Sequence, residues 1–141
     1  MKPLPVRPEV TIEWLTRRQA NTLPDQFGIV VTRLAPGVLE SRLEILPWMR
    51  APNGYLHAGV AVALADTSCG YACTAHLPDG ARGFTTIELK TNFLRTALAG
   101  RITCVATADH AGKSTQIWSA TVSDPEGEPM ALFRCTQLVL R

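Results

Sequence analysis

The sequence lacks an excess of charge of either sign, and this absence excludes several classes of protein. Its 141 residues include 14 Lys and Arg against 12 Asp and Glu, a formal net charge of +2. That balance does not argue for nucleic acid or an anionic membrane surface as a partner. Apolar runs of membrane-spanning length without a polar break are also missing. Residues 1–10 hold three prolines and no hydrophobic signal core, so we expect a loose leader and a cytoplasmic protein.

Cysteines are few, and none forms a C-x-x-C pair. Cys69 and Cys73 lie four apart and would share a helix face, but no histidine follows at ligand spacing, which argues against a metal site. With Cys104 and Cys135 they are predicted to be reduced core residues. The sequence has no G-x-G-x-x-G motif and no Gly-rich loop followed by Lys-Ser/Thr. We therefore predict no cofactor and no metal.

The alternation of apolar and polar residues predicts one α+β domain. A short helix over residues 11–21 should precede two strands, and a long apolar helix should follow them. The second half is predicted to consist of strands joined by turns. Three or four of these strands should form a meander. The predicted strands cover residues 28–34, 38–46, 84–94, 101–109, 114–124 and 131–140.

The long helix, predicted over residues 56–75, is apolar on nearly every side, yet it contains Asp66 near its middle. Such a helix is usually buried, and a buried carboxylate without a partner is costly. Asp66 shares a face with Val62 and Gly70, whereas His57, nine residues earlier, points to the opposite side. A His57–Asp66 dyad is therefore not expected. The alternative is a helix break at Asp66, with its carboxylate solvated or capping the next segment.

The start of this helix is a second candidate for chemistry. The sequence His57-Ala58-Gly59 follows an Asn53-Gly54 turn and places unpaired backbone N–H groups where they could bind an oxyanion. These amides lie about 10–12 Å from Asp66 along the axis. One small carbonyl group cannot contact both groups of the same chain. If they serve one reaction, two copies must meet with antiparallel helices, which predicts a homodimer.

The segment GYLHAGVAVALADTSCGYA resembles the helix motif of hotdog-fold acyl-CoA thioesterases of the phenylacetate-degradation (PaaI-like) type. Those proteins show His-Gly-Gly at the helix start and an Asp or Glu eight residues after the first Gly. The stretches TTIELKTNFLRTALAG and HAGKSTQIW resemble the strands that follow, so the similarity covers residues 28–141. The resemblance implies a hotdog fold, a curved antiparallel sheet wrapped around one long buried helix, and dimers that pair further into tetramers.

The resemblance also implies roles for individual residues. Asp66 would be the catalytic carboxylate, acting as a nucleophile or as a general base on water. The amide of Ala58 or Gly59 from the partner subunit would polarise the thioester carbonyl, and Thr86 would help hold the water. His57 is a further catalytic candidate, with a structural hydrogen-bonding role as the alternative. The candidates for binding the CoA nucleotide are Arg95, Lys113 and Ser114.

Two positions depart from the family pattern. The first Gly of the motif is Ala58, which keeps its N–H but adds a methyl group that could crowd a bulky acyl group. The family often has Asn six residues before the His, where this chain has Ala51. Asn53, two residues further on, is a candidate for binding substrate, but its role need not be the same.

The function predicted from the sequence is hydrolysis of a small or medium acyl-CoA, aromatic ones included, to free acid and CoA. Coenzyme A then enters as part of the substrate. One alternative is an acyl-CoA-binding or sensing protein whose carboxylate is structural. Another is a hydratase or dehydratase of the same fold, which needs a His and an acid converging on the substrate.

Overall fold

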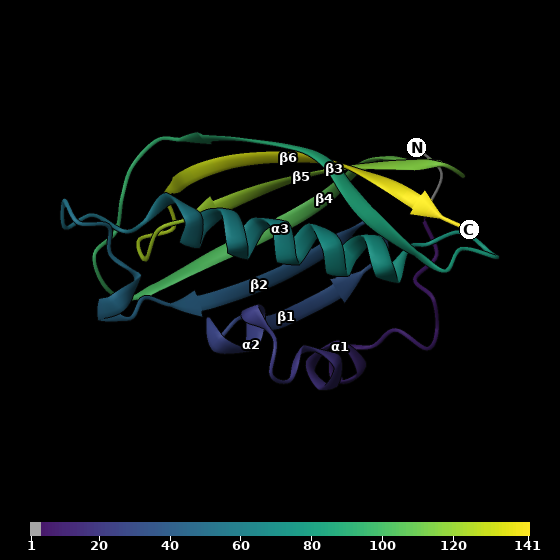
Figure 1. Ribbon diagram of the computed structural model, residues 1–141, viewed down its shortest axis with the longest axis horizontal. Helices are drawn as coiled ribbons and strands as arrows, with labels where there is room; N and C mark the ends of the chain where they lie inside the picture. Colours follow the sequence, from purple (N-terminus) through teal and green to yellow (C-terminus); the bar gives the residue numbers. More distant parts are fainter. Residues whose placement is uncertain (1–3) are drawn as a thin grey trace.

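A six-stranded antiparallel sheet curves around one long helix, α3 (Ala58–Ala75), in the computed structural model, which describes residues 4–141 (Figure 1). This arrangement confirms the α+β prediction. In order across the sheet, the strands are β1 (Val30–Ala35), β2 (Val38–Glu44), β4 (Arg101–Ala111), β5 (Thr115–Ser123), β6 (Pro129–Leu140) and β3 (Gly83–Phe93).

The place of β3 differs from the predicted meander. Strands β4, β5 and β6 do form consecutive hairpins, but β3 pairs with β6 at one end of the sheet, and β4 pairs with β2 instead. A register shift between Thr86 and Glu88 marks a bulge in β3. Bulges bend a strand and re-aim its side chains. The bulge therefore sets which β3 side chains face α3.

Helix α3 is unbroken from Ala58 to Ala75, which rules out the predicted alternative of a break at Asp66. Its small residues let the sheet approach closely, and ten of its eighteen residues are buried. All four cysteines have free thiols and lie in the core, as their apolar surroundings in the sequence predicted. Their burial places them in packing contacts rather than at the surface.

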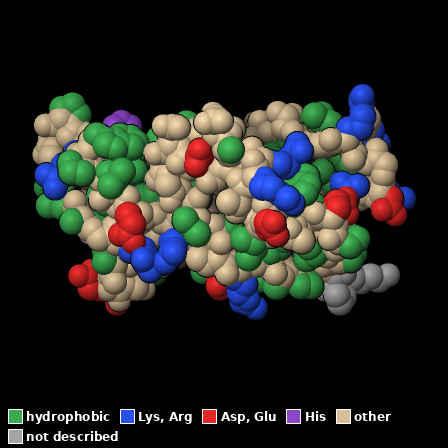
Figure 2. Space-filling view, turned by 90° about the horizontal axis from the view of Figure 1, so that it is seen from below, with side chains coloured by type: hydrophobic (Ala, Val, Ile, Leu, Met, Phe, Trp, Pro, Cys, Tyr) green, Lys and Arg blue, Asp and Glu red, His purple; other side chains and the backbone are tan. Residues whose placement is uncertain are grey.

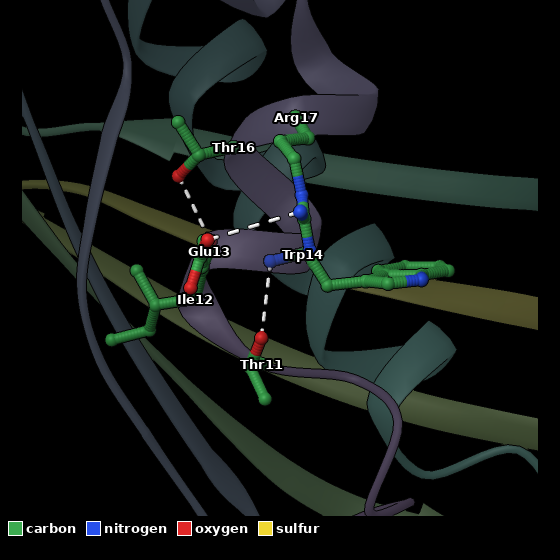
Figure 3. Close-up of polar contacts among 6 residues, drawn as sticks. All are labelled: Thr11, Ile12, Glu13, Trp14, Thr16 and Arg17. Atoms are coloured by element: carbon green, nitrogen blue, oxygen red, sulfur yellow. Dashed lines mark hydrogen bonds and ion pairs between the residues drawn. The ribbon is translucent and has the colours of Figure 1, made fainter.

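Helix α1 (Ile12–Gln19) lies within the range predicted for the first helix and has Thr11 as its N-cap. The Thr11 hydroxyl oxygen accepts the Trp14 N–H at 3.0 Å, and Arg17 pairs with Glu13 one turn away (Figure 3). In Figure 3 the Trp14 side chain points away from Ile12. A second short helix, α2 (Leu23–Gln26), was not predicted; Pro24 lies in its first turn, a position that proline favours.

Residues 4–10, expected as a loose leader, lie against the end of α3. The Arg7 N–H donates to the Ala75 carbonyl at 2.8 Å, and Val10 is only 4% exposed. Residues 1–3 of the predicted leader lie outside the described residues. None of the helices formed by residues 4–141 combines the length and hydropathy that a membrane crossing requires.

Candidate active site

Asp66 lies in a cavity of about 220 Å³ between α3 and the start of β3. Its Oδ1 atom is buried and has no hydrogen-bond partner among residues 4–141. Desolvation by burial raises the pKa of this carboxyl above its ordinary value. A carboxylate that is deprived of water and of protein partners is a stronger base than one in solution. The cavity therefore holds a carboxylate that is a better proton acceptor than one in solution.

Thr86, the strand residue predicted to help hold water, lines the same cavity as Asp66. Its hydroxyl donates to Gln137 Oε1 at 2.7 Å, across the β3–β6 pairing. Gln137 is fully buried, and its Nε2 contacts Cys135 Sγ at 3.3 Å. Because the hydroxyl proton of Thr86 is committed to Gln137, its oxygen lone pairs remain to accept a hydrogen bond from a molecule in the cavity.

Aromatic side chains form the walls beside Asp66. Gly70 faces Phe84 so closely that a Cβ on the glycine would lie 3.1 Å from the ring. Tyr71 is fixed by donating its hydroxyl to Gln19 Oε1 at 2.7 Å, and burial raises its pKa to about 12. The cavity thus has rigid apolar walls with one carboxylate on them.

The start of α3 is capped by its own histidine. The N-cap residue His57 accepts the Gly59 N–H on Nδ1 at 2.8 Å. A Cβ at Gly59 would lie 2.9 Å from that nitrogen, so the close approach depends on glycine. For the Ala58 N–H no acceptor is found among residues 4–141. Of the two amides predicted to bind an oxyanion, the one at Ala58 is free and the one at Gly59 is occupied.

One chain does not bring the two halves of the candidate site together. Ala58 and Asp66 are eight residues apart on a continuous helix, about 12 Å along its axis. The helix start has its own cavity of about 470 Å³, lined by His57 and Ala58 together with Phe93 and Arg95. The carboxylate and the free amide therefore face two different cavities of the subunit.

The residues predicted to bind substrate are also divided. Arg95 lies at the helix-start cavity, where its guanidinium is 3.7 Å from Asp124 Oδ2. Lys113 and Ser114 line a cavity just beyond the other end of α3, so one chain does not place them with Arg95. Asn53 Oδ1 accepts the Tyr55 N–H at 3.2 Å, which holds the turn before the helix.

Two polar residues near Asp66 were missed at the level of the sequence. Gln137 stands at an inward position of a strand whose other inward residues, Phe133 and Cys135, are apolar. A polar residue at an inward position of an apolar strand is a pattern from which Gln137 could have been identified in the sequence. Gln19 ends α1 and is buried, but nothing in the sequence indicates that it reaches Tyr71. Within residues 4–141, no three or more His, Cys, Asp or Glu side chains gather as a metal site requires.

The sequence is similar to those of known thioesterases. Residues 53–131 match the model of the thioesterase superfamily. The chain is 32% identical over 114 residues to the 1,4-dihydroxy-2-naphthoyl-CoA hydrolase of Listeria monocytogenes, covering 81% of this chain and 92% of the relative. The matched segment includes all of α3 and most of the sheet.

Solved structures agree with the sequence comparison. A variant of the thioesterase PA1618 from Pseudomonas aeruginosa superposes with a TM-score of 0.89 at 29% identity, over 96% of this chain and 97% of the other. The PaaI protein of Escherichia coli superposes with a TM-score of 0.80 at 22% identity, over 89% of each chain, which shows the shared fold alone. The predicted hotdog fold is confirmed.

Proposed function

Because the chain belongs to the thioesterase superfamily and is a thioester hydrolase of the hotdog fold, we propose that it acts on acyl-CoA thioesters. The acyl group is small or medium in size, and aromatic acyl groups are among those proposed. The observation that carries the catalytic part of the proposal is the buried, unpartnered Oδ1 of Asp66 in an aromatic-walled cavity. The related hydrolase of an aromatic CoA thioester supports the substrate class.

Asp66 acts as a general base. It takes a proton from a water molecule that also donates to the Thr86 oxygen, while the water oxygen attacks the thioester carbonyl carbon. The tetrahedral intermediate collapses, the carbon–sulfur bond breaks, and CoA leaves as a thiolate that is protonated as Asp66 gives up the proton. A thiolate is a good leaving group, so the step needs no strong general acid. The raised pKa of Asp66 supports this role, because it makes the carboxylate a stronger base than a solvated one.

The oxyanion is held by the Ala58 N–H of a second subunit. This part of the proposal rests on the 12 Å that separates Asp66 from the free amide of its own chain. Strand β3 ends the sheet with its outer edge unpaired, and Ile87, Leu89 and Phe93 on it are exposed. A partner joined there forms a homodimer, and two such dimers form a tetramer. Backbone donors at a helix start also benefit from the helix dipole.

The test is a panel of acyl-CoA thioesters assayed with wild type and with Asp66→Asn, with Glu126→Gln in the exposed β5–β6 turn as the matched control. Turnover should fall about 10²–10⁴-fold in Asp66→Asn, as for loss of a general base, with acyl-CoA binding retained. The control should hydrolyse at the wild-type rate. Tight acyl-CoA binding by a wild type that turns over no thioester would contradict the proposal and support a ligand-binding protein.

A nucleophilic role for Asp66 is tested separately. Attack by the carboxylate would form a mixed anhydride, which hydroxylamine converts to a hydroxamate on Asp66. In the general-base mechanism, the peptide that contains Asp66 keeps its mass after turnover with hydroxylamine present. Hydration of an enoyl substrate is disfavoured because His57 Nδ1 is occupied by the Gly59 N–H, so the imidazole serves as the N-cap of α3.

A further inference from the structure

The cavity at Asp66 adjoins a larger one. The larger cavity has a volume of about 610 Å³ and lies between α1, the second half of α3 and the start of β3. Four residues line both spaces: Pro24, Tyr71, Thr74 and Phe84. Because they share these walls, the two cavities adjoin, and together they make up a groove with the candidate carboxylate at one end.

The floor of this groove is one face of α3. Four lining residues are spaced three or four positions apart along the chain, so they lie on one side of α3 or directly after its last turn. They are Asp66, Gly70, Thr74 and Leu77. From Asp66 to Thr74 the helix rises about 12 Å. The groove is therefore longer than a single aromatic ring, and it has room for a medium-length acyl chain that starts at the scissile thioester.

Cationic side chains line the larger cavity of the groove. Arg18 of α1 lines it, with its guanidinium carbon 4.5 Å from the centre of the Trp14 ring. Stacking occupies the face of a guanidinium and leaves its in-plane N–H donors free for a carboxylate. No carboxylate lies within ion-pair distance of Arg18 among residues 4–141. Figure 2 shows this face, where Lys and Arg side chains lie beside hydrophobic ones over α1.

The other charges along the groove leave a positive balance. Arg82 lines it from just before β3, and one of its N–H groups donates to the backbone oxygen of Arg141. Arg7 and Glu9 also line it, but they pair with each other at 3.2 Å. Asp25, close enough to Tyr71 to raise the pKa of its hydroxyl, accepts the Asn21 N–H. Arg18 and Arg82 are the two arginines of the groove that pair with no Asp or Glu side chain among residues 4–141.

We propose that this groove binds the acyl part of the thioester and that Arg18 and Arg82 bind a carboxylate at the end of the acyl chain. The preferred substrates are then medium-length ω-carboxyacyl-CoA thioesters. Trp14, Tyr71 and Phe84 contact the methylene chain, and the arginines bind the anion with charge-assisted hydrogen bonds. The inference rests on the proposed function, because it takes Asp66, the proposed catalytic residue, as the point where the acyl chain starts.

The experiment compares suberyl-CoA with octanoyl-CoA, two eight-carbon thioesters that differ in a terminal carboxylate. Wild type should hydrolyse suberyl-CoA with the higher kcat/KM. Arg18→Gln should lower kcat/KM for suberyl-CoA about tenfold, the usual size of one hydrogen bond to a charged group, and leave octanoyl-CoA unchanged. The matched control is Arg17→Gln, which removes the neighbouring arginine that pairs with Glu13 outside the groove and should change neither value (Figure 3).

A second arm identifies the source of the anion. The same assays with dephospho-CoA thioesters remove the 3′-phosphate of the nucleotide. The proposal expects the Arg18→Gln loss to persist with suberyl-dephospho-CoA. It is overturned if Arg18→Gln slows octanoyl-CoA and suberyl-CoA alike and the loss disappears without the 3′-phosphate, because the arginines then bind the nucleotide. It is also overturned if wild type prefers octanoyl-CoA.

A binding measurement separates failure of this inference from failure of the proposed function. Equilibrium dialysis with Asp66→Asn measures affinity without hydrolysis, and suberyl-CoA should bind more tightly than octanoyl-CoA, with the difference lost in Asp66→Asn/Arg18→Gln. If wild type hydrolyses no thioester but this difference is found, the groove is supported and the catalytic proposal fails. If thioesters are hydrolysed and no difference is found, the anionic acyl group is ruled out.

Discussion

The Thr86 hydroxyl donates to Gln137 Oε1 over 2.7 Å, so a fully buried amide fixes the direction of its only proton. If the free lone pairs of Thr86 hold the water that Asp66 activates, Gln137 is a positioning residue for hydrolysis. Its side chain does not line the cavity, and it acts through Thr86.

Replacing Thr86 with Val should lower kcat by about tenfold, the usual size of one lost hydrogen bond, and leave KM nearly unchanged. The matched control Thr86→Ser keeps the hydroxyl and should retain most activity. Gln137→Met should reproduce part of the loss, and the double variant should lose less than the sum of the two, because the residues act in series. Steady-state kinetics of the four proteins measures this coupling, and strictly additive losses would contradict it.

Asp66→Asn should stabilise the fold at neutral pH although it removes activity. Burial raises the pKa of Asp66, so the folded chain holds this proton more tightly than the unfolded chain. The contribution of Asp66 to the free energy of unfolding therefore decreases as pH rises from 3.8, the ordinary pKa of the group. It stays low above the pKa of the folded state. Urea unfolding at pH 7 should show a higher midpoint for Asp66→Asn. The difference should vanish near pH 3.8, and a variant less stable than wild type at pH 7 would disagree with the burial described here.

The role of His57 is predicted to be capping rather than proton transfer. Asn is a good N-cap residue, so His57→Asn should keep stability close to wild type and activity within a few fold. His57→Ala removes the acceptor of the Gly59 N–H and should cost about 1 kcal/mol in the free energy of unfolding. Chemical denaturation and kinetics of both variants check this. A loss of activity in His57→Asn as large as in Asp66→Asn would instead indicate acid–base catalysis.

His76, at the other end of α3, should make the fold sensitive to mild acid. Its Nε2 accepts the Gly37 N–H at 2.9 Å, its Nδ1 lies 2.7 Å from the Ala72 carbonyl oxygen, and burial lowers its pKa. Below its ordinary value of 6.5 the unfolded chain binds the proton more readily, so stability is lost as pH falls from 6.5 toward the folded pKa.

Unfolding midpoints of wild type should therefore drop between pH 7.5 and pH 5.5. His76→Gln removes the titrating group and should show a smaller drop, while exposed His110→Asn should behave as wild type. Equal slopes in wild type and His76→Gln would show that another group titrates.

The sequence predicted those parts of the fold that depend on local patterns. The unbroken apolar helix around Asp66 and the hairpins of β4, β5 and β6 follow from hydrophobic periodicity and turn residues, and each is present. Asp66 was singled out because a carboxylate is unusual on such a helix, and its Oδ1 is buried with no hydrogen-bond partner among residues 4–141.

The remaining features depend on contacts between distant segments. Nothing local in residues 84–94 indicates that β3 pairs with β6 rather than with β4. Ile87, Leu89 and Phe93 lie in a predicted strand, but the sequence could not show that these apolar side chains point away from the core and are 58%, 43% and 50% exposed. Likewise, the occupied amide of Gly59 follows from a side-chain rotamer of His57 that the sequence does not encode in any visible pattern.

The position of β3 at the end of the sheet also bears on how the protein behaves when it is purified. Its eleven residues leave one row of backbone groups unpaired, and apolar side chains stand beside that row. Long apolar edges of this kind template the addition of further strands and lead to aggregation. Dilution or mutations that separate the proposed dimer expose this edge. The protein should then precipitate rather than remain a stable monomer.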